Sequence, residues 1–138
     1  MDARCKALAE AVGRHVVERE FADLLDLFAP WLAEQFSASD LQDMIDAAGD
    51  GLPAPAKFTL DEGMLELEEL RTPSDYGPPT RPLPDAITAA NYRGWICIQL
   101  QPDPKDAGEL HACYDVWMAL VEHGGETMVG YLEAAEAS

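Results

Sequence analysis

Basic side chains are scarce in this sequence of 138 residues: 9 Lys and Arg stand against 26 Asp and Glu, and the formal net charge is -17 at pH 7. Such an excess of carboxylates repels nucleic-acid phosphates and anionic lipid headgroups. We therefore expect no nucleic acid and no membrane among the partners of this chain. The charge favours a basic protein partner, although acidity that only maintains solubility is the commoner reason for it.

Cysteine and long apolar runs are also scarce. Cys5, Cys97 and Cys113 form no CxxC pair, and an odd, small number of cysteines is not a disulfide framework. This usage favours a reducing compartment and predicts a cytoplasmic protein. No apolar run approaches the roughly 20 residues of a membrane span. Residues 1–10 carry charges in place of the apolar core of a secretory signal, so we expect no such signal.

The remaining composition is that of an ordinary globular protein. Hydrophobic residues make up 48% of the chain and charged residues 25%, which argues against disorder of the whole chain. The length suits one domain with a sizeable core. We expect a single domain over residues 1–138, with helices at about 3–48, a sheet at about 57–134 and a proline-rich loop at 72–86.

Apolar residues recur at helical spacing in the first third of the chain. Leu8, Val12 and Val16 are four residues apart, and the segment 21–28 is apolar at i, i+3, i+4 and i+7. These stripes predict two helices, the second of which ends or kinks before Pro30.

A third helix is predicted from its end signals. Ser39 is the expected N-cap, with Gln42 completing a capping box, and Gly49 and Gly51 are expected to stop the helix.

The middle of the chain changes its hydrophobic period. Leu65 and Leu67 alternate with Glu66 and Glu68, which predicts a strand with one wet face, joined through a turn at 61–63 to a short strand at 58–60. The following loop is marked by Pro73, Pro78, Pro79, Pro82 and Pro84. Proline cannot donate to a strand ladder, so no ladder strand is expected there.

The last third predicts three strands joined as hairpins, at 95–100, 112–121 and 127–132. The glycines of the 123–126 turn tolerate the positive φ of a tight hairpin. Symmetric loops would place Cys97 opposite Cys113.

This register distributes large apolar side chains over both faces of the sheet. One face is expected to carry Ile96, Ile98, Val116, Met118, Leu120, Val129 and Tyr131, with Met118 opposite Tyr131 and Leu120 opposite Val129. The other is expected to carry Trp95, Cys97, Trp117, Ala119, Val121, Met128 and Leu132. Helices can cover one face, and a pocket, the proline loop or a second subunit must cover part of the other. A homodimer through the sheet is therefore expected.

The order of helices followed by an antiparallel sheet resembles the cone-shaped α+β fold of the nuclear-transport-factor-like and ketosteroid-isomerase-like superfamily. The comparison rests on the segment 21–28, the short helix after Ser39, and the final strands from Tyr114 to Trp117 and from Gly130 to Leu132. The resemblance implies N-terminal helices packed on a bent antiparallel sheet. It fixes no activity, because members of the superfamily serve as isomerases, dehydratases, scaffolds, transport adaptors and immunity proteins. The proline loop departs from the usual shorter connection.

Asp115 is the candidate catalytic residue. It lies on an apolar strand with Trp95 and Trp117 nearby, and a carboxylate among aromatic rings can act as a general acid or base. In an isomerase-like cone a tyrosine would assist it, but Tyr114 is its strand neighbour and must point to the opposite face. The alternative is an Asp115 that pairs with Arg93 or lies at a dimer seam.

Metal and cofactor motifs are absent. No two of His15, His111 and His123 share a metal-ligand spacing, and the sequence contains no GxxxxGK[ST], GxGxxG or GxSxG pattern. We predict neither a metal nor a cofactor.

Two functions remain. The first is a non-enzymatic acidic binding protein that holds a basic protein partner, as an inhibitor or immunity protein does, with Glu66 and Glu68 in its acidic patch. The second is a pocket for a small apolar ligand, either a simple binder or an isomerase or dehydratase that uses Asp115. The aromatic residues expected to contribute to binding are Trp31, Trp95, Trp117 and Tyr131.

Overall fold

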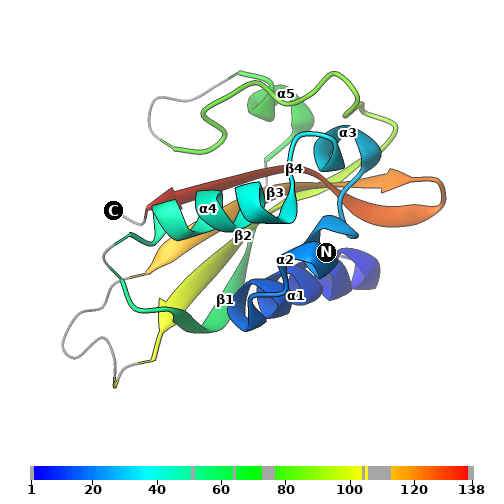
Figure 1. Ribbon diagram of the computed structural model, residues 1–138. Coiled ribbons are helices and arrows are strands. Elements are labelled where there is room, and N and C mark those ends of the chain that lie inside the picture. The colour runs from blue at the N-terminus through cyan, green and yellow to red at the C-terminus, as the bar shows by residue number, and fades with distance from the viewer. Residues whose placement is uncertain are drawn as a thin grey trace.

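The computed structural model describes residues 2–50, 52–63, 65–72, 77–103, 105 and 113–136 and has the predicted α+β architecture. A four-stranded antiparallel sheet has the strand order β1-β2-β3-β4, and the N-terminal helices pack against one of its faces (Figure 1). The strands are β1 (Pro55–Gly63), β2 (Tyr92–Pro102), β3 (Tyr114–His123) and β4 (Glu126–Glu136). The helices are α1 (Ala3–Glu18), α2 (Phe21–Leu25), α3 (Pro30–Ala33), α4 (Ala38–Ala48) and α5 (Leu67–Leu70).

Helix α1 confirms the first predicted stripe. The Asp2 side chain caps it by accepting a hydrogen bond from the backbone N–H of Cys5 at 2.9 Å. Leu8, Val12 and Val16 are buried against the sheet, and the helix ends at Arg19 with φ 60. The spacing of apolar residues thus gave both the helix and its buried face.

The second predicted helix is shorter than expected. Helix α2 ends at Leu25, because the following residues run beside the outer edge of β4 instead of continuing the helix. The N–H of Ala29 donates to the carbonyl of Val129 at 2.8 Å, and the N–H of Val129 donates to the carbonyl of Leu27 at 2.9 Å. These bonds satisfy part of an edge strand that would otherwise be unpaired.

The capping residue of α4 is Ser37, not Ser39 as predicted. Its hydroxyl accepts from the N–H of Asp40 at 3.0 Å, and the Asp40 carboxylate accepts from the N–H of Ser37 at 3.1 Å. Asp40 therefore takes the part of the capping box assigned to Gln42, since a carboxylate also favours the first turn of a helix.

The sheet face under the helices is closed by a filled apolar core. Leu24, Leu41 and Ile45 are fully buried there against side chains of β2, β3 and β4. Of the buried residues of this core, Tyr114 lines one described pocket, and Leu32 and Leu132 line another.

The predicted strand at 65–68 is wrong. Strand β1 runs through the expected turn at 61–63 and ends at Gly63, opposite Trp95. Leu67 and Leu70 then fall on one side of the short helix α5, three residues apart, and both are buried. Their helical spacing outweighed the two-residue alternation of leucine and glutamate.

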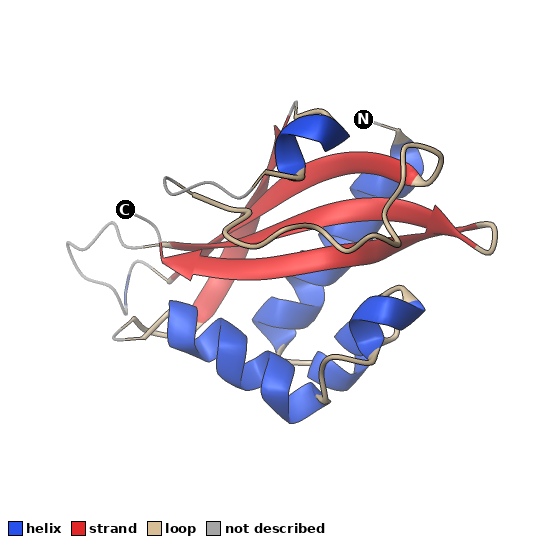
Figure 2. Cartoon of the chain, turned by 90° about the horizontal axis from the view of Figure 1, so that it is seen from above, coloured by secondary structure: helices blue, strands red, loops and turns tan. Residues whose placement is uncertain are grey.

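The second face of the sheet is covered in part by the chain itself. The described residues of segment 65–91, which are 65–72 and 77–91 and include α5 and part of the proline-rich loop, lie on the side of the sheet opposite the N-terminal helices (Figures 1 and 2). Its residues Leu67, Leu70, Leu83 and Ile87 pack against the second face. No strand is found in residues 77–91, as the prolines predicted, while 73–76 lie outside the described residues. The sequence left three possible covers for this face: a pocket, the proline-rich loop or a second subunit. The proline-rich loop covers part of it, together with α5.

The predicted register between β2 and β3 is wrong. Cys97 lies opposite Trp117, which is four residues further along the chain than Cys113, the partner that a symmetric loop about Lys105 would give it. The hairpin turn has positive φ at both Gly124 (61) and Gly125 (83), as expected.

A bulge in β4 exchanges two side chains between the faces. Leu120 pairs with Val129 as predicted, but Ala119 pairs with Tyr131, which leaves Gly130 as the extra residue. Met118 consequently faces Leu132 in the helix-side core, and Tyr131 joins the second face. The expected assignment of Tyr131 and Leu132 is therefore reversed.

Candidate functional site

Three of the predicted binding residues meet on the second face of the sheet. The ring centroids of Trp95 and Trp117 are 5.8 Å apart at 24°, and those of Trp95 and Tyr131 are 6.1 Å apart at 28°. Both pairs are stacked, and Trp95 is common to them. We call these three side chains the aromatic stack.

Small neighbours allow Trp95 to lie down on the sheet. In the ladder Gly63 and Ala119 flank it on the adjacent strands. A Cβ atom placed on Gly63 would be 2.5 Å from Cδ1 of Trp95, so the indole occupies the space of the missing side chain. Trp95 is only 1% exposed, and its Nε1 has no hydrogen-bond partner. Aromatic stacking and burial thus outweigh one unsatisfied donor.

A buried carboxylate closes one end of the site. Glu133 lies opposite Trp117 in the ladder and is 8% exposed. Its Oε1 accepts hydrogen bonds from the Tyr131 hydroxyl and, at 3.0 Å each, from the backbone N–H and hydroxyl of Thr80. Burial, followed by the hydrogen bond and charge of Glu133, raises the pKa of Tyr131. The proline-rich loop is therefore fastened to the second face through a polar cluster.

Asp115 lies on the same face, two residues before Trp117 on β3. It is half-buried, and its Oδ1 is buried without a hydrogen-bond partner. Burial raises the pKa of Asp115, the charge of Asp61 adds to this, and a hydrogen bond with the Cys97 thiol opposes it. Burial and the same two carboxylates raise the pKa of Cys97 to about 12. Cys97 is thus a thiol donor, not a thiolate nucleophile, at neutral pH.

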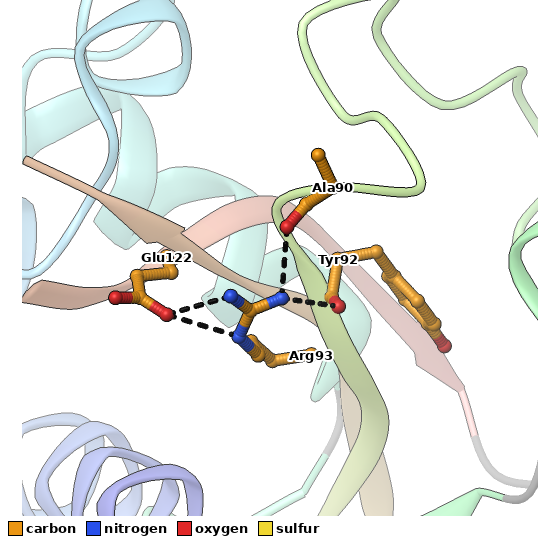
Figure 3. Close-up of polar contacts among 4 residues, drawn as sticks. All are labelled: Ala90, Tyr92, Arg93 and Glu122. Carbon is orange, nitrogen blue, oxygen red and sulfur yellow. Dashed lines mark hydrogen bonds and ion pairs between the residues drawn. The ribbon is translucent and has the colours of Figure 1, made fainter. Parts of the chain in front are cut away.

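The alternative partner for Asp115 is engaged elsewhere. Arg93 donates from Nε and Nη2 to Oε2 of Glu122, at 3.1 and 2.6 Å, and from Nη1 to the carbonyls of Ala90 and Tyr92 (Figure 3). The expected pairing of Asp115 with Arg93 is therefore wrong. Arg93 instead holds the end of segment 65–91 against β3.

An isomerase-like site would also need a tyrosine hydroxyl beside Asp115, and neither Tyr114 nor Tyr131 provides one. Tyr114 is buried in the helix-side core, on the opposite face from Asp115, as the strand alternation predicted. The hydroxyl of Tyr131 is committed to Glu133. No hydroxyl of the described residues hydrogen-bonds Asp115. Asp115 can therefore accept a proton, or a hydrogen bond from a cationic group, but no hydroxyl of the described residues assists it.

Trp31, another predicted binding residue, is separate from the aromatic stack. Its Nε1 donates to the carbonyl of Gly130 at 2.9 Å, and its ring meets the His123 ring edge-on at 5.5 Å. Trp31 thereby packs at the β4 edge next to the bulge.

Glu66 and Glu68 are exposed at the beginning of α5, where negative charge complements the helix dipole. Helix α5 lies on the same side of the sheet as the aromatic stack, because Leu67 and Leu70 pack in one cluster with Trp95 and Tyr131. Near Glu66, Tyr92 donates to the carbonyl of Leu65 at 2.8 Å. Burial and the charges of Glu66 and Glu69 raise the pKa of Tyr92 to about 12.

Sequence reasoning missed Glu133, Thr80 and Arg81. The guanidinium carbon of Arg81 lies 5.7 Å from the centroid of the Tyr131 ring. Beside them, a pocket of about 240 Å³ is lined by Arg81, Tyr131, Pro82 and residues of the α3 region. Glu133 could have been found as an acidic residue in an apolar strand, two positions after Tyr131. Nothing in the sequence marked Arg81, an arginine in a loop, as part of the site.

One group in the described residues has metal-ligand atoms close together. Ligand atoms of His15, Glu20 and Asp23 lie within 4.8 Å of one another, and Nδ1 of His15 is 3.0 Å from Oε1 of Glu20. The His15–Glu20 hydrogen bond braces the turn between α1 and α2. Since Glu20 is 41% and His15 19% exposed, this surface contact accounts for the arrangement without an ion. His111 lies outside the described residues.

Comparison with known proteins gives no relative: no protein-family model, no curated protein and no solved structure matches the chain. Among the described helices, none combines the length and apolar character that crossing a membrane requires.

Proposed function

We propose that the protein is a non-enzymatic acidic binding protein whose partner is a basic protein, in the manner of an inhibitor or immunity protein. The observation that carries this proposal is the gathering of aromatic rings and carboxylates on one side of the sheet. Trp117, Asp115 and Asp61 lie on that face, and exposed Glu66 and Glu68 lie on the same side. Aromatic anchors beside unpaired negative charge suit a surface that recognises cationic side chains.

The charge of the whole chain supports the same function. A net charge of -17 creates a field that accelerates the approach of a basic protein and weakens as salt screens it. Several of the few cations are used within the described fold, since Arg19 pairs with Asp46 and Arg93 with Glu122. Internal ion pairs therefore leave a large excess of carboxylates for a partner.

The test is capture of a partner from the native lysate on immobilised protein, washed at low and then at high salt. We expect one basic protein to be retained at low salt and lost at high salt. The double variant Glu66→Lys, Glu68→Lys should slow its association several-fold, because rim charges act mainly on the association rate. Asp43→Lys with Glu10→Lys is the matched control on the helix side. Failure to retain any basic protein, with the fold intact, would overturn the proposal.

Catalysis by Asp115 is the second candidate function, favoured by its half-buried carboxylate and raised pKa. An isomerase or dehydratase of the ketosteroid-isomerase-like type would use it as the general base for a small apolar substrate. The binding function is preferred because the hydroxyls of Tyr114 and Tyr131 do not assist Asp115. Asp115→Asn separates the two, since it would abolish turnover of any substrate found by thermal-shift screening while the fold persists.

The homodimer and the cytoplasmic location are also proposals. The reason for a dimer was an uncovered apolar sheet face, and segment 65–91 packs on part of that face. Strand β1 is an edge of the sheet and the remaining argument for self-association. Light scattering across a concentration series tests it: a mass of 15.1 kDa throughout would exclude the dimer.

A further inference from the structure

We propose that Trp117 and Asp115 form a receptor for one arginine side chain of the partner, with the guanidinium against the indole and bonded to the exposed part of the Asp115 carboxylate. This inference rests on the proposed function and gives its binding face a specific occupant. The two side chains share the second face of β3, two residues apart, and both are half-buried. A ligand can therefore reach the exposed part of each side chain from solvent.

The unmet acceptor is the first reason. Oδ1 of Asp115 is buried and has no hydrogen-bond partner, while the Cys97 thiol lies beside the carboxylate. Buried carboxylate oxygens without a donor are rare because they lose their hydration without replacement. A charged N–H donor that binds the exposed part of this carboxylate offsets the charge that burial leaves uncompensated.

The surrounding charge is the second reason. Asp61 lies beside Cys97 on β1, and Glu133 lies opposite Trp117 on β4. Glu133 already accepts three hydrogen bonds, whereas no Lys or Arg of the described residues forms an ion pair with Asp61 or Asp115. The indole of Trp117 thus lies in a negative field that favours a cation over its ring.

The choice of arginine comes from the neighbouring ring. Arg81 lies over Tyr131, and Thr80, the residue before it, is bonded to Glu133. The chain therefore places one arginine of its own against an aromatic ring at a carboxylate on this face. Trp117 and Asp115 likewise place an aromatic ring and a carboxylate two residues apart on the same face, as Tyr131 and Glu133 do. A planar guanidinium stacks on an indole and still directs an N–H to the carboxylate, which a lysine ammonium does less well.

The experiment uses the full chain labelled with ¹⁵N and a glycine-flanked triarginine peptide. The control peptides carry citrulline, the neutral analogue, or lysine at the same positions. The indole N–H signals of Trp31, Trp95 and Trp117 are assigned with single Trp→Phe variants. We expect the Trp117 signal to shift on titration with the arginine peptide, more weakly with lysine and not with citrulline. The Trp31 signal, hydrogen-bonded to Gly130, should stay in place.

Asp115→Asn should weaken binding of the arginine peptide about tenfold or more, as expected for loss of a charge-assisted hydrogen bond. Asp43→Asn, which makes the same change at an exposed position on the helix side, should change it by less than about twofold. Unmoved Trp31 and Trp95 signals show that Asp115→Asn keeps the fold. An unshifted Trp117 signal, equal binding of lysine, or equal losses in the two variants would overturn the receptor.

The receptor and the proposed function fail separately. A basic protein captured by the wild type and equally by Asp115→Asn overturns the receptor and leaves the binding function standing. Arginine-peptide binding at Trp117 without any captured basic protein overturns the function and leaves the receptor.

Discussion

The hydroxyl of Tyr131 donates a hydrogen bond to Oε1 of Glu133, two residues further along the same face of β4. The same carboxylate oxygen receives the backbone N–H and the hydroxyl of Thr80 from the proline-rich loop. One buried oxygen thus joins the aromatic stack to the segment that covers it. The bulge at Gly130 makes this possible, because without it Tyr131 would point into the helix-side core.

Glu133→Ala should therefore destabilise the fold markedly. It leaves the donors of Thr80 and Tyr131 without their acceptor, at a cost of about 1–3 kcal/mol for each buried group that water does not reach. We expect the free energy of unfolding, measured in urea, to fall by about 2–4 kcal/mol. The control is Glu122→Ala, which removes the half-exposed ion pair with Arg93 and should cost about 1 kcal/mol or less. Equal losses in the two variants would contradict the central role of Glu133.

Gly63→Ala tests the space that Trp95 occupies. The added Cβ would lie 2.5 Å from Cδ1 and 3.0 Å from the carbonyl oxygen of Trp95, so the buried indole and the strand must both move. Overpacking of this kind costs about 1–3 kcal/mol. At Gly94 a Cβ atom would meet nothing within 4 Å, which makes Gly94→Ala the matched control. Urea unfolding gives the cost. Near-ultraviolet circular dichroism should show a disturbed aromatic stack for Gly63→Ala alone.

The sequence predicted the features that depend on local periodicity. The stripe of Leu8, Val12 and Val16 gave α1, and the glycines at 124 and 125 gave the last hairpin. It failed where tertiary contacts decide. Leu67 and Leu70 form a helix because both are buried against the second face, whereas their local pattern is compatible with a helix and with a strand.

The candidate site was predicted in its residue types and only partly in its geometry. Trp95, Trp117 and Asp115 share a face because strand alternation carries that information. Tyr131 reached the same face through a bulge at Gly130, and a glycine within a strand indicates a bulge only weakly because glycine also occurs in regular strands. Arg81 came from a loop whose path depends on long-range packing. The register of two strands joined by a long connection, such as the pairing of Cys97 with Trp117, likewise cannot be predicted from local sequence patterns.

Alkylation should separate the three cysteines. Burial and the charges of Asp115 and Asp61 raise the pKa of Cys97 to about 12, and burial also raises the pKa of Cys5 and of Cys113. Cys113 is half-buried, whereas the other two are buried. With iodoacetamide at pH 8, mass spectrometry of the native protein should find Cys113 modified first. All three should react alike in urea. Preferential modification of native Cys97 would contradict its environment.

The pH dependence of stability should reveal Asp115 directly. Its pKa is raised in the folded state above the ordinary value of 3.8, so the folded protein holds this proton to higher pH than the unfolded chain does. The contribution of Asp115 to the free energy of unfolding therefore falls as pH rises from 3.8 through the folded pKa. Asp115→Asn cannot titrate, so its stability relative to wild type should increase across this window and level off above it. Urea unfolding of both proteins between about pH 3 and pH 7 measures the difference. A difference that stays constant, or that decreases with pH, would place Asp115 in contact with water or with a cation, and the unmet acceptor on which the arginine receptor depends would be lost.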